Sequence, residues 1–487
     1  MRKANQEQVY RKIATVVGED SIATSRYEKM SYSLNRNWYS RTLLSIKKEV
    51  PLADFVVYPK STEQVASILK IANEAKVPVT PYSGGSSGMG GNVPVKKGIV
   101  IDLKHLNKII EINEHSLLVT VQAGVTCWQL EDELNRRGYT SGHIQASHYS
   151  ACIGGSIALR AAGRLSTGYG KIEDMVTGLE VVLPDGEVLR TRTVPRHATG
   201  PDLNQLFIGS EGALGIITEA TLVINNMPEK RVFRAVLFPS LHSGLNAMRR
   251  IMQKHLRPTM GRLYDERETE TLFKNTWGID EKGAYLVFGF DGPSAVVDRT
   301  MEIALQICSE EDGKDLGSEK GDFWWNHKFS DYYPKDEKDV ERWKALMGGK
   351  AAGATIDICA PYHKIEDIHN DLRKTFKEKF GNKYKVDIYG HLSHWYTSGT
   401  MTYCRWHLRE VPQDEELLTI YREVWDSLIQ VVIEHGAVIE HHHGVGRVLG
   451  RYIKDQYGAA GFGVLKKIKQ AIDPNNIMNI GVMGLGE

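Results

Sequence analysis

A glycine-rich stretch, PYSGGSSGMGG (residues 81–91), limits the possible folds of this chain more than any other segment. It contains five glycines and three serines and directly follows an apolar run, KVPVT. Upstream, DFVVYP is typical of a short buried strand, and Ser61 with Gln64 resembles a capping box that opens the helix EQVASILKIANEA. The order strand, helix, strand, glycine loop predicts a parallel, right-handed β-α-β unit.

Glycine has no Cβ, so such a loop can adopt positive φ and bring consecutive backbone N–H groups close to an anion. We expect the ligand to be a phosphate or pyrophosphate, with a flexible surface loop as the alternative. No GK[ST] follows, which excludes a P-loop. The segment that follows, GNVPVKKGIVIDL, is extended, whereas the Rossmann dinucleotide motif needs a helix at this point.

Two further small-residue loops occur in the first 225 residues. Residues 98–134 predict two strands and then a helix. Next come a second glycine pair, Gly154-Gly155, and a hairpin whose turn contains Pro184, Asp185 and Gly186. A third loop, Ser210-Glu211-Gly212, precedes a buried strand. Three such loops predict one extended ligand held between sheets.

The composition narrows the class of protein. A chain of 487 residues predicts two or three domains, and its formal net charge of +1 offers no general attraction to nucleic acid. The five cysteines form no CxxC pair, which argues against a disulfide framework, a zinc ribbon and an iron–sulfur cluster. No run approaches the 18 apolar residues that span a bilayer. We therefore expect a cytoplasmic protein, peripheral to a membrane at most, with small-molecule or protein partners.

The three loops identify a family resemblance. PYSGGSS, SHYSACIGG and EGALGIITEA, with the C-terminal DPNNIMNIG, resemble segments of the vanillyl-alcohol oxidase and p-cresol methylhydroxylase superfamily. Its FAD-linked oxidase group includes D-lactate and glycolate dehydrogenases, and alkylglycerone-phosphate synthase also belongs to the superfamily. The resemblance covers most of the chain. It implies an α+β fold, in which a two-subdomain FAD-binding domain is joined to an α+β cap domain with a largely antiparallel sheet.

The resemblance also implies the flavin contacts. Several relatives tether FAD through a histidine in the first loop; that loop has none here, so we expect noncovalent FAD. The pyrophosphate is expected at Ser83, Gly84, Gly85, Ser86 and Ser87. The other implied flavin contacts are Pro81, Tyr82, Ser147, His148, Ala151, Gly154, Gly155, Arg160, Glu211, Gly212, Ile216 and Ile217.

The expected domain order follows from the same comparison and from the pattern of the second half. We predict an N-terminal helical segment (1–50), the FAD-binding domain (51–226), the cap domain (227–435) and a C-terminal segment that returns to the flavin domain (436–487). In the cap, strand-like pieces such as KRVFRAVLF, AYLVFGF, ATIDICAP and YKVDIYG alternate with amphipathic helices. Relatives of this kind are often dimers, so a homodimer is expected.

The most distinctive chemical run is EHHHGVGR, with His441, His442 and His443 at its centre. At most two adjacent histidines can face one site, and imidazole serves there either as a metal ligand or in proton transfer. The run resembles the His-His-His-Gly-Val-Gly of alkylglycerone-phosphate synthases rather than the Gly-Glu-His-Gly of the dehydrogenases. Tyr403 lies where the synthases place a tyrosine proposed as acid or base.

His391 belongs to a second histidine-bearing segment. The dehydrogenases carry a Gly-His-x-Gly-Asp-Gly-Asn-x-His run that binds a divalent metal in some members, and this chain retains only Gly390-His391 of it. A metal held by His391, His394 and one C-terminal histidine has acceptable ligand chemistry. Because the spacing is broken, we predict no metal and place His391 among the catalytic residues.

Two arginines are candidate anchors for an anionic substrate. Arg262 falls where relatives have an arginine before a leucine and an aspartate, and Arg342 lies within a residue of one that the synthases use for substrate. Solvated surface charge is the alternative for both. A nearby aromatic run, FWWNHKF (323–329), is read either as packing in the cap core or as the lining of a substrate tunnel.

These features predict an FAD-dependent oxidoreductase. We expect it to oxidise a small hydroxylated, anionic substrate, a 2-hydroxy acid or related alcohol, by hydride transfer to flavin N5, with an acceptor protein, a quinone or oxygen taking the electrons. The alternative is a synthase-like transferase that forms an ether bond through a flavin N5 adduct. A noncatalytic electron-relay subunit is the third hypothesis, and the many His, Tyr and Arg candidates argue against it.

Overall fold

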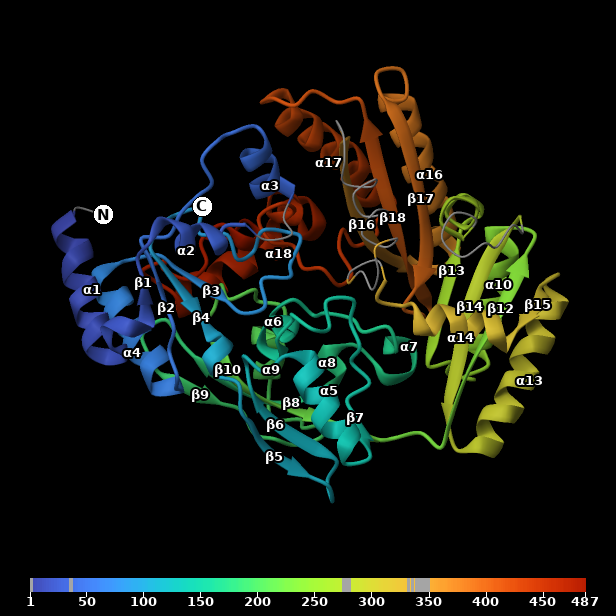
Figure 1. The fold of residues 1–487 in the computed structure, drawn as a ribbon, viewed down its shortest axis with the longest axis horizontal. Helices are drawn as coiled ribbons and strands as arrows, with labels where there is room; N and C mark the ends of the chain where they lie inside the picture. Colours follow the sequence, from blue (N-terminus) through green and yellow to red (C-terminus); the bar gives the residue numbers. More distant parts are fainter. Residues whose placement is uncertain (1–2, 35–37, 274–281, 331–332, 334–336, 338–350) are drawn as a thin grey trace. The chain divides into compact units, whose positions relative to one another are not determined.

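The computed structural model describes residues 3–34, 38–273, 282–330, 333, 337 and 351–487. The chain divides into two compact units (Figure 1). The first unit comprises residues 1–161, 171–225 and 442–487, and the second comprises residues 162–170 and 226–441. Each unit is therefore built from separate stretches of the chain. None of the described helices is both long enough and apolar enough to cross a membrane.

A four-stranded sheet carries the glycine loop of the first unit. Its strands, in spatial order, are β1 (Ile22–Ala23), β2 (Phe55–Val57), β4 (Ile99–Asp102) and β3 (Val79–Tyr82), and both β2 and β3 pair with β4 in parallel. The helix α4 (Thr62–Ala75) connects β2 to β3 and buries Val65, Ile68 and Leu69 in a shared core with Val9 and Ile13 of α1 (Lys3–Val17). The predicted order of strand, helix, strand and loop is confirmed.

The capping of α4 differs slightly from the expectation. The Ser61 side chain accepts a hydrogen bond from the Gln64 N–H at 3.3 Å, as an N-cap does. The Gln64 side chain, however, accepts from the N–H of Lys60 and not from that of Ser61. The helix begins where the sequence predicts because the N-cap alone satisfies one of its free N–H groups.

A second sheet in the first unit is entirely antiparallel. In spatial order its strands are β5 (Ile109–Asn113), β6 (Leu118–Gln122), β10 (Ile216–Val223), β8 (Val176–Val182) and β9 (Val188–Arg190). Residues 98–134 form three strands and a helix, so the expectation of two strands is wrong: IIEIN makes a partly exposed edge strand without a clear apolar run. The hairpin at Pro184–Gly186 joins β8 to β9 as predicted.

Short helices complete the first unit around these two sheets. They are α2 (Arg26–Ser31), α3 (Trp38–Ser45), α5 (Cys127–Arg136), α6 (Ile153–Ala158), α8 (Ile172–Met175) and α9 (Leu203–Phe207), with α18 (Ile453–Ile472) near the C-terminus. Past α18 the chain joins β3: Val79 donates its N–H to the carbonyl of Ile477, and Asn479 donates its N–H to the carbonyl of Val79.

The second unit is built on one seven-stranded antiparallel sheet. Its strands, in spatial order, are β15 (Lys314–Gly317), β12 (Lys230–Phe238), β14 (Ala284–Gly292), β13 (Met260–Tyr264), β17 (Lys385–Ser393), β18 (Gly399–Arg409) and β16 (Ala351–Pro361). The main helices are α10 (Leu241–Gln253), α13 (Ser294–Glu310), α14 (Ser318–Asn326), α16 (Tyr362–Phe380) and α17 (Glu416–Glu434), with the short α7 (Ser166–Tyr169) and α11 (Glu266–Glu268). The expected α+β architecture with an antiparallel sheet is confirmed.

The two faces of this sheet differ in chemistry. On one face, Leu263, Leu392, Cys404 and Trp406 are fully buried, and α16 lies along the strands that carry the last three (Figure 1). Successive residues of a strand point to opposite faces. The other face therefore carries the intervening residues, which include Arg262, His391 and Tyr403.

Candidate active site

The glycine loop of the first unit offers a row of backbone donors. Ser83 to Gly88 are half-buried, and Gly85 has a φ of 63°, a conformation that favours glycine. Within the described residues, the backbone N–H groups of Ser83, Gly84, Gly85 and Ser86 donate to no protein acceptor. A half-buried N–H without an acceptor is costly, and several in sequence are suited to the oxygens of a phosphate.

The other two small-residue loops lie against the first. A Cβ added to Gly155 would meet Ser83 Oγ at 2.5 Å, and one added to Gly212 would meet Pro81 Cγ at 2.7 Å. Gly84 itself is so close to the carbonyl of Ser150 that a Cβ there would lie 2.0 Å from its oxygen. The structure therefore brings the three predicted loops together, and glycine is required at their contacts.

A buried histidine that the sequence reasoning did not select lies in the second of these segments. His143 is 2% exposed, and neither imidazole nitrogen has a hydrogen-bond partner within the described chain. Burial lowers the pKa of His143 to about 3, so its ring is neutral. An unpartnered buried imidazole in the segment that leads to the second small-residue loop fits the FAD that the family resemblance implies. The sequence signal that could have pointed to His143 is its position, four residues before Ser147, where the second family-like segment begins.

Other predicted flavin contacts have roles that the structure makes visible. Glu211 is 7% exposed and accepts hydrogen bonds from the backbone N–H groups of Val445 (2.6 Å) and Gly446 (2.9 Å). Burial raises the pKa of Glu211 to about 7. Its carboxyl group therefore holds the C-terminal segment in place. Arg160 donates to the Gln205 side chain at 3.2 Å.

The remaining predicted contacts are mostly buried side chains around the loops. The buried ones are His148, Ala151, Ile216 and Ile217. The ring of Tyr82 packs edge-on against that of Tyr32, with the centroids 4.6 Å apart. Ser87 Oγ accepts a hydrogen bond from the Met89 N–H at 3.3 Å.

A row of polar residues crosses the sheet of the second unit. The strand register pairs Tyr264 on β13 with His391 on β17, His391 with Tyr403 on β18, and Tyr403 with Asp357 on β16. Directly paired residues lie on the same face of a sheet. Arg262 lies two residues before Tyr264 and Arg405 two residues after Tyr403, which places both on this face as well. We call the face carrying Arg262, Tyr264, His391, Tyr403 and Arg405 the polar face.

His391 lies at the centre of the polar face. Its ring stacks on that of Tyr403, with the centroids 4.9 Å apart and the planes inclined by 19°. Its Nδ1 lies 3.0 Å from Oε2 of Glu268, a buried carboxylate on α11 that carries no sequence motif. Burial lowers the pKa of His391 well below its usual range, and the charges of Arg262 and Arg405 lower it further. The imidazole is therefore neutral at neutral pH.

Cationic and aromatic side chains surround this histidine. The guanidinium of Arg262 lies 5.3 Å from the ring centre of Tyr264 and 5.9 Å from that of Trp324, and its Nε has no partner in the described chain. The guanidinium of Arg164, from the loop before α7, lies 5.7 Å from the Trp324 ring. Trp324 is buried on α14 and donates its indole N–H to Tyr264 at 2.6 Å. Arg342 lies outside the described residues.

The FWWNHKF segment takes part in packing within the second unit, and its reading as the lining of a substrate tunnel stays a prediction. Trp324 packs inside the unit, yet it also contacts both Arg164 and Arg262. Trp325 stacks on Phe233, with the ring centroids 4.7 Å apart, and Lys328 Nζ lies 4.1 Å from the centre of the Trp325 ring. Through Trp324 the segment packs against Arg262 of the polar face and against Arg164.

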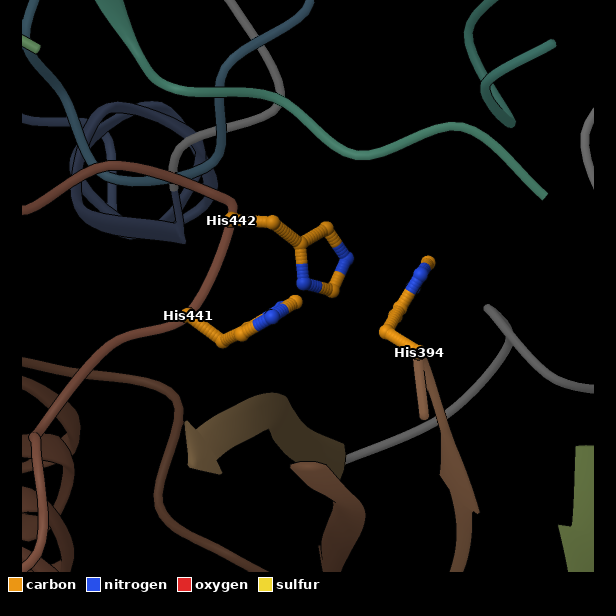
Figure 2. Close-up of side chains that lie close together, drawn as sticks. All are labelled: His394, His441 and His442. Atoms are coloured by element: carbon orange, nitrogen blue, oxygen red, sulfur yellow. The ribbon is translucent and has the colours of Figure 1, made fainter. Parts of the chain in front are cut away.

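The histidine run divides between the two units. Figure 2 shows the imidazoles of His394 and His441 close together, and their centroids are 5.2 Å apart. Ser166 Oγ lies 2.5 Å from His394 Nδ1, and the Tyr396 hydroxyl lies 2.8 Å from His441 Nε2. These four residues belong to the second unit, whereas His442 and His443 begin the last stretch of the first, where their rings lie 4.3 Å apart.

Comparisons with known proteins agree with this picture. Residues 53–192 match a family model described as an FAD binding domain, and residues 227–483 match the C-terminal domain of FAD linked oxidases. An uncharacterized FAD-linked oxidoreductase, YgcU of Escherichia coli K12, is 33% identical over 479 residues and covers 96% of both chains.

Two other relatives have named activities. The alkyldihydroxyacetonephosphate synthase of Dictyostelium discoideum is 27% identical over 94% of this chain and 78% of its own. The mitochondrial D-lactate dehydrogenase (cytochrome) of Arabidopsis thaliana is 27% identical over 95% of this chain and 78% of its own.

Solved structures share the fold. An alkyldihydroxyacetonephosphate synthase gives a TM-score of 0.80 at 24% identity, covering 97% of this chain and 84% of its own. A p-cresol methylhydroxylase gives a TM-score of 0.77 at 18% identity, and the match covers 100% of this chain and 98% of its own. The matches confirm the predicted resemblance and FAD as the cofactor.

Proposed function

Because this chain belongs to the FAD-linked oxidases, a family of flavoprotein oxidoreductases, we propose that it oxidises a small hydroxylated, anionic substrate. The substrate class is a 2-hydroxy acid or a related alcohol. The observation that carries the proposal is the polar face of the second unit, where a neutral histidine, a tyrosine and two arginines lie on one side of adjacent strands.

The residues of the polar face divide into two roles. Arg262 and Arg405 supply guanidinium groups, whose planar N–H donors match the oxygens of a carboxylate. His391 is neutral because of burial and the neighbouring cations, so its free ring nitrogen can accept the proton of the substrate hydroxyl. Tyr403 stacks against His391 and is the second candidate for this proton transfer. Removal of the proton from the hydroxyl oxygen favours departure of the hydride from the carbon that bears this hydroxyl group.

FAD, when bound, supplies the hydride-accepting centre. In the first unit, the N–H groups of Ser83 to Ser86 would hold its pyrophosphate, and His143 would provide a neutral polar contact. We propose that FAD is bound noncovalently, since the glycine loop contains no histidine. Electrons would leave for oxygen, a quinone or a carrier protein.

A synthase-like transferase is the second candidate. The sequence His441-His442-His443-Gly444-Val445-Gly446 and the position of Tyr403 resemble the synthases, and the D. discoideum synthase is 27% identical. Such an enzyme would replace the fatty acid of acylated dihydroxyacetone phosphate by an alcohol, without net redox change. The polar face would then bind the phosphate.

The first experiment is an anaerobic absorbance spectrum of the purified holoenzyme with a panel of compounds. The panel contains D-2-hydroxy acids, phenolic alcohols and acyl-dihydroxyacetone phosphate. Lasting bleaching of the flavin band by a hydroxy compound is the expected result and identifies the substrate class. If only the acyl phosphate alters the spectrum, with fatty acid released and no lasting reduction, the transferase replaces the oxidoreductase.

A further inference from the structure

Glu268 is a buried acid in direct contact with the histidine of the polar face. Its side chain is fully buried, and its Oε2 lies 3.0 Å from Nδ1 of His391. The two residues are 123 positions apart in the sequence, so this contact is made by the tertiary fold. A carboxylate in this place acts on the chemistry of the sheet face through the imidazole that it contacts.

The turn that carries Glu268 is held rigidly. Asp265 accepts the backbone N–H of Glu268 at 2.6 Å and also that of Gly390 at 2.9 Å, next to His391 on β17. The Asp265 carboxylate also lies 3.1 Å from Nε2 of the buried His369 on α16. Asp265 therefore ties α11, β17 and α16 together. As a result, the backbone positions of Glu268 and His391 are fixed relative to each other before any ligand binds.

The contact determines where the proton of the neutral imidazole lies. A carboxylate only accepts hydrogen bonds, so the 3.0 Å contact requires a proton on Nδ1 of His391. A competing donor, Nη2 of Arg262, lies farther from the same nitrogen, at 3.4 Å. Were Arg262 to prevail, Nδ1 would be the acceptor and the proton would move to Nε2. The shorter, charge-assisted contact favours the first arrangement.

We propose that Glu268 is a positioning residue: by accepting the Nδ1–H of His391 it fixes the ring and leaves Nε2 as the bare acceptor for the substrate hydroxyl proton. This inference rests on the proposed function, which makes His391 a proton acceptor. Other charged groups near the ring are Arg262 on β13, Arg405 on β18, His394 past the end of β17 and Arg164 before α7. All of these are basic side chains, whereas Glu268 is the acid that contacts the ring.

The first test reads the tautomer without any substrate. Holoenzyme labelled with ¹⁵N-histidine is compared with the His391→Gln variant, in which the missing signals identify His391. The expected spectrum has a protonated Nδ1 and a bare Nε2. In Glu268→Met, which removes the acceptor, we expect the proton to move to Nε2 because Arg262 becomes the remaining partner of Nδ1. A protonated Nε2 in the unmodified protein would overturn the proposal.

The second test measures the rate of flavin reduction in a single turnover. Glu268→Gln preserves the side-chain volume, and we expect reduction to slow about 100-fold with little change in FAD content or substrate affinity. Glu270→Gln is the matched control, since Glu270 lies two residues further on, is exposed and pairs with Arg267. Glu268→Asp should recover part of the lost rate, because it keeps a negatively charged group that only accepts hydrogen bonds, whereas the glutamine amide is neutral and can also donate. Equal rates in Glu268→Gln, Glu270→Gln and the unmodified protein would contradict the proposal.

The two tests separate this inference from the function on which it rests. If the spectrum shows the expected tautomer and no hydroxy compound reduces the flavin, the oxidoreductase fails while the contact between Glu268 and His391 stands. If a hydroxy compound reduces the flavin and Glu268→Met leaves both the tautomer and the rate unchanged, the oxidoreductase stands and the positioning role is refuted.

Discussion

Gly85 is the residue at which backbone conformation and ligand binding are most closely linked. Its φ of 63° favours glycine, and a Cβ there would lie 2.0 Å from the Tyr82 hydroxyl. We predict that Gly85→Ala folds and loses most of its flavin, because the loop must shift to relieve the overlap. The ratio of flavin to protein absorbance in the purified protein measures this.

Gly88 supplies the matched control for that prediction. It belongs to the same loop, has no positive φ, and a Cβ added there meets no atom within 4 Å. Gly88→Ala should therefore retain its flavin. Full flavin content in Gly85→Ala, or equal loss in both variants, would contradict the placement of the pyrophosphate at this loop.

Tyr403 provides a second prediction at the scale of one residue. Tyr403→Phe keeps the ring that stacks on His391 and removes only the hydroxyl. If the hydroxyl takes part in proton transfer, flavin content should be unchanged and flavin reduction should slow by about 100-fold. Stopped-flow absorbance under anaerobic conditions measures the rate. Tyr457→Phe is a suitable control, since Tyr457 is exposed on α18 of the first unit. An unchanged rate in Tyr403→Phe would remove this residue from the mechanism.

Some residues of the candidate site could be predicted from the sequence, and others could not. The glycine loop is a local signal, since several glycines in succession change what the backbone can do whatever surrounds them. Glu268 and His143 carry no such signal. Glu268 is significant only because β13 and β17 are neighbours. His143 is significant only because neither nitrogen of its buried ring has a hydrogen-bond partner among the residues that the structure describes. The catalytic assignments to Tyr403, His391 and His441–His443 remain predictions, and Arg342 lies outside the described residues.

The contact between Glu211 and the C-terminal segment gives a prediction at the scale of elements. Burial raises the pKa of Glu211 from 4.5 to about 7, so the folded state binds this proton more tightly than the unfolded state does. Below pH 4.5 the stabilisation is fully present, and it is lost as the pH rises through about 7. The shift corresponds to about 3 kcal/mol at most.

Glu211→Gln separates this effect from all other titrations. The amide stays neutral at every pH, so the unmodified protein should lose stability relative to the variant between pH 5 and pH 8. The temperature at which flavin fluorescence appears on heating, compared between the two proteins at both pH values, measures the difference. A difference that is the same at pH 5 and pH 8 would show that Glu211 does not change protonation in this range.

At the same scale, four strands of the second unit were expected from the sequence: β12 and β14, which carry long apolar runs, and β16 and β17. In contrast, β13 and β18 were not expected. In β18, Thr402, Cys404 and Trp406 face the buried side, and Met401, Tyr403 and Arg405 face the other. This alternation of small, polar and aromatic residues is a weak strand signal, because one face serves the candidate site instead of the core.

At the scale of the whole molecule, the sequence motifs predicted the family and the cofactor because four of them are spread over most of the chain. The C-terminal segment (436–487) was expected to return to the flavin domain, but the motifs could not reveal which contacts complete the first unit. Its last stretch, 442–487, is separated from the rest of the unit by the whole of residues 226–441. Within the unit, Arg447 donates to the carbonyls of Gly90 and Gly91 at 2.8 Å each. The flavin loop thus depends on residues more than 350 positions away.

Asn479 tests this dependence directly. Its Nδ2 donates to the carbonyls of Gly91 (2.9 Å) and Glu211 (2.6 Å), and its Oδ1 accepts from Arg447 at 2.8 Å. Asn479→Ala removes three hydrogen bonds, although Arg447 still donates to the carbonyls of Gly91 and Ile480. The Glu211 carbonyl loses its side-chain donor, which costs of the order of 1–3 kcal/mol. We therefore predict weaker FAD binding and faster hydrogen exchange in residues 83–91 and 209–215, with no change in β17 or β18. The control is Asn475→Ala, since Asn475 is exposed and bonds only to Asn73 in the described chain. Unchanged exchange in residues 83–91 would mean that the glycine loop keeps its conformation without the end of the chain.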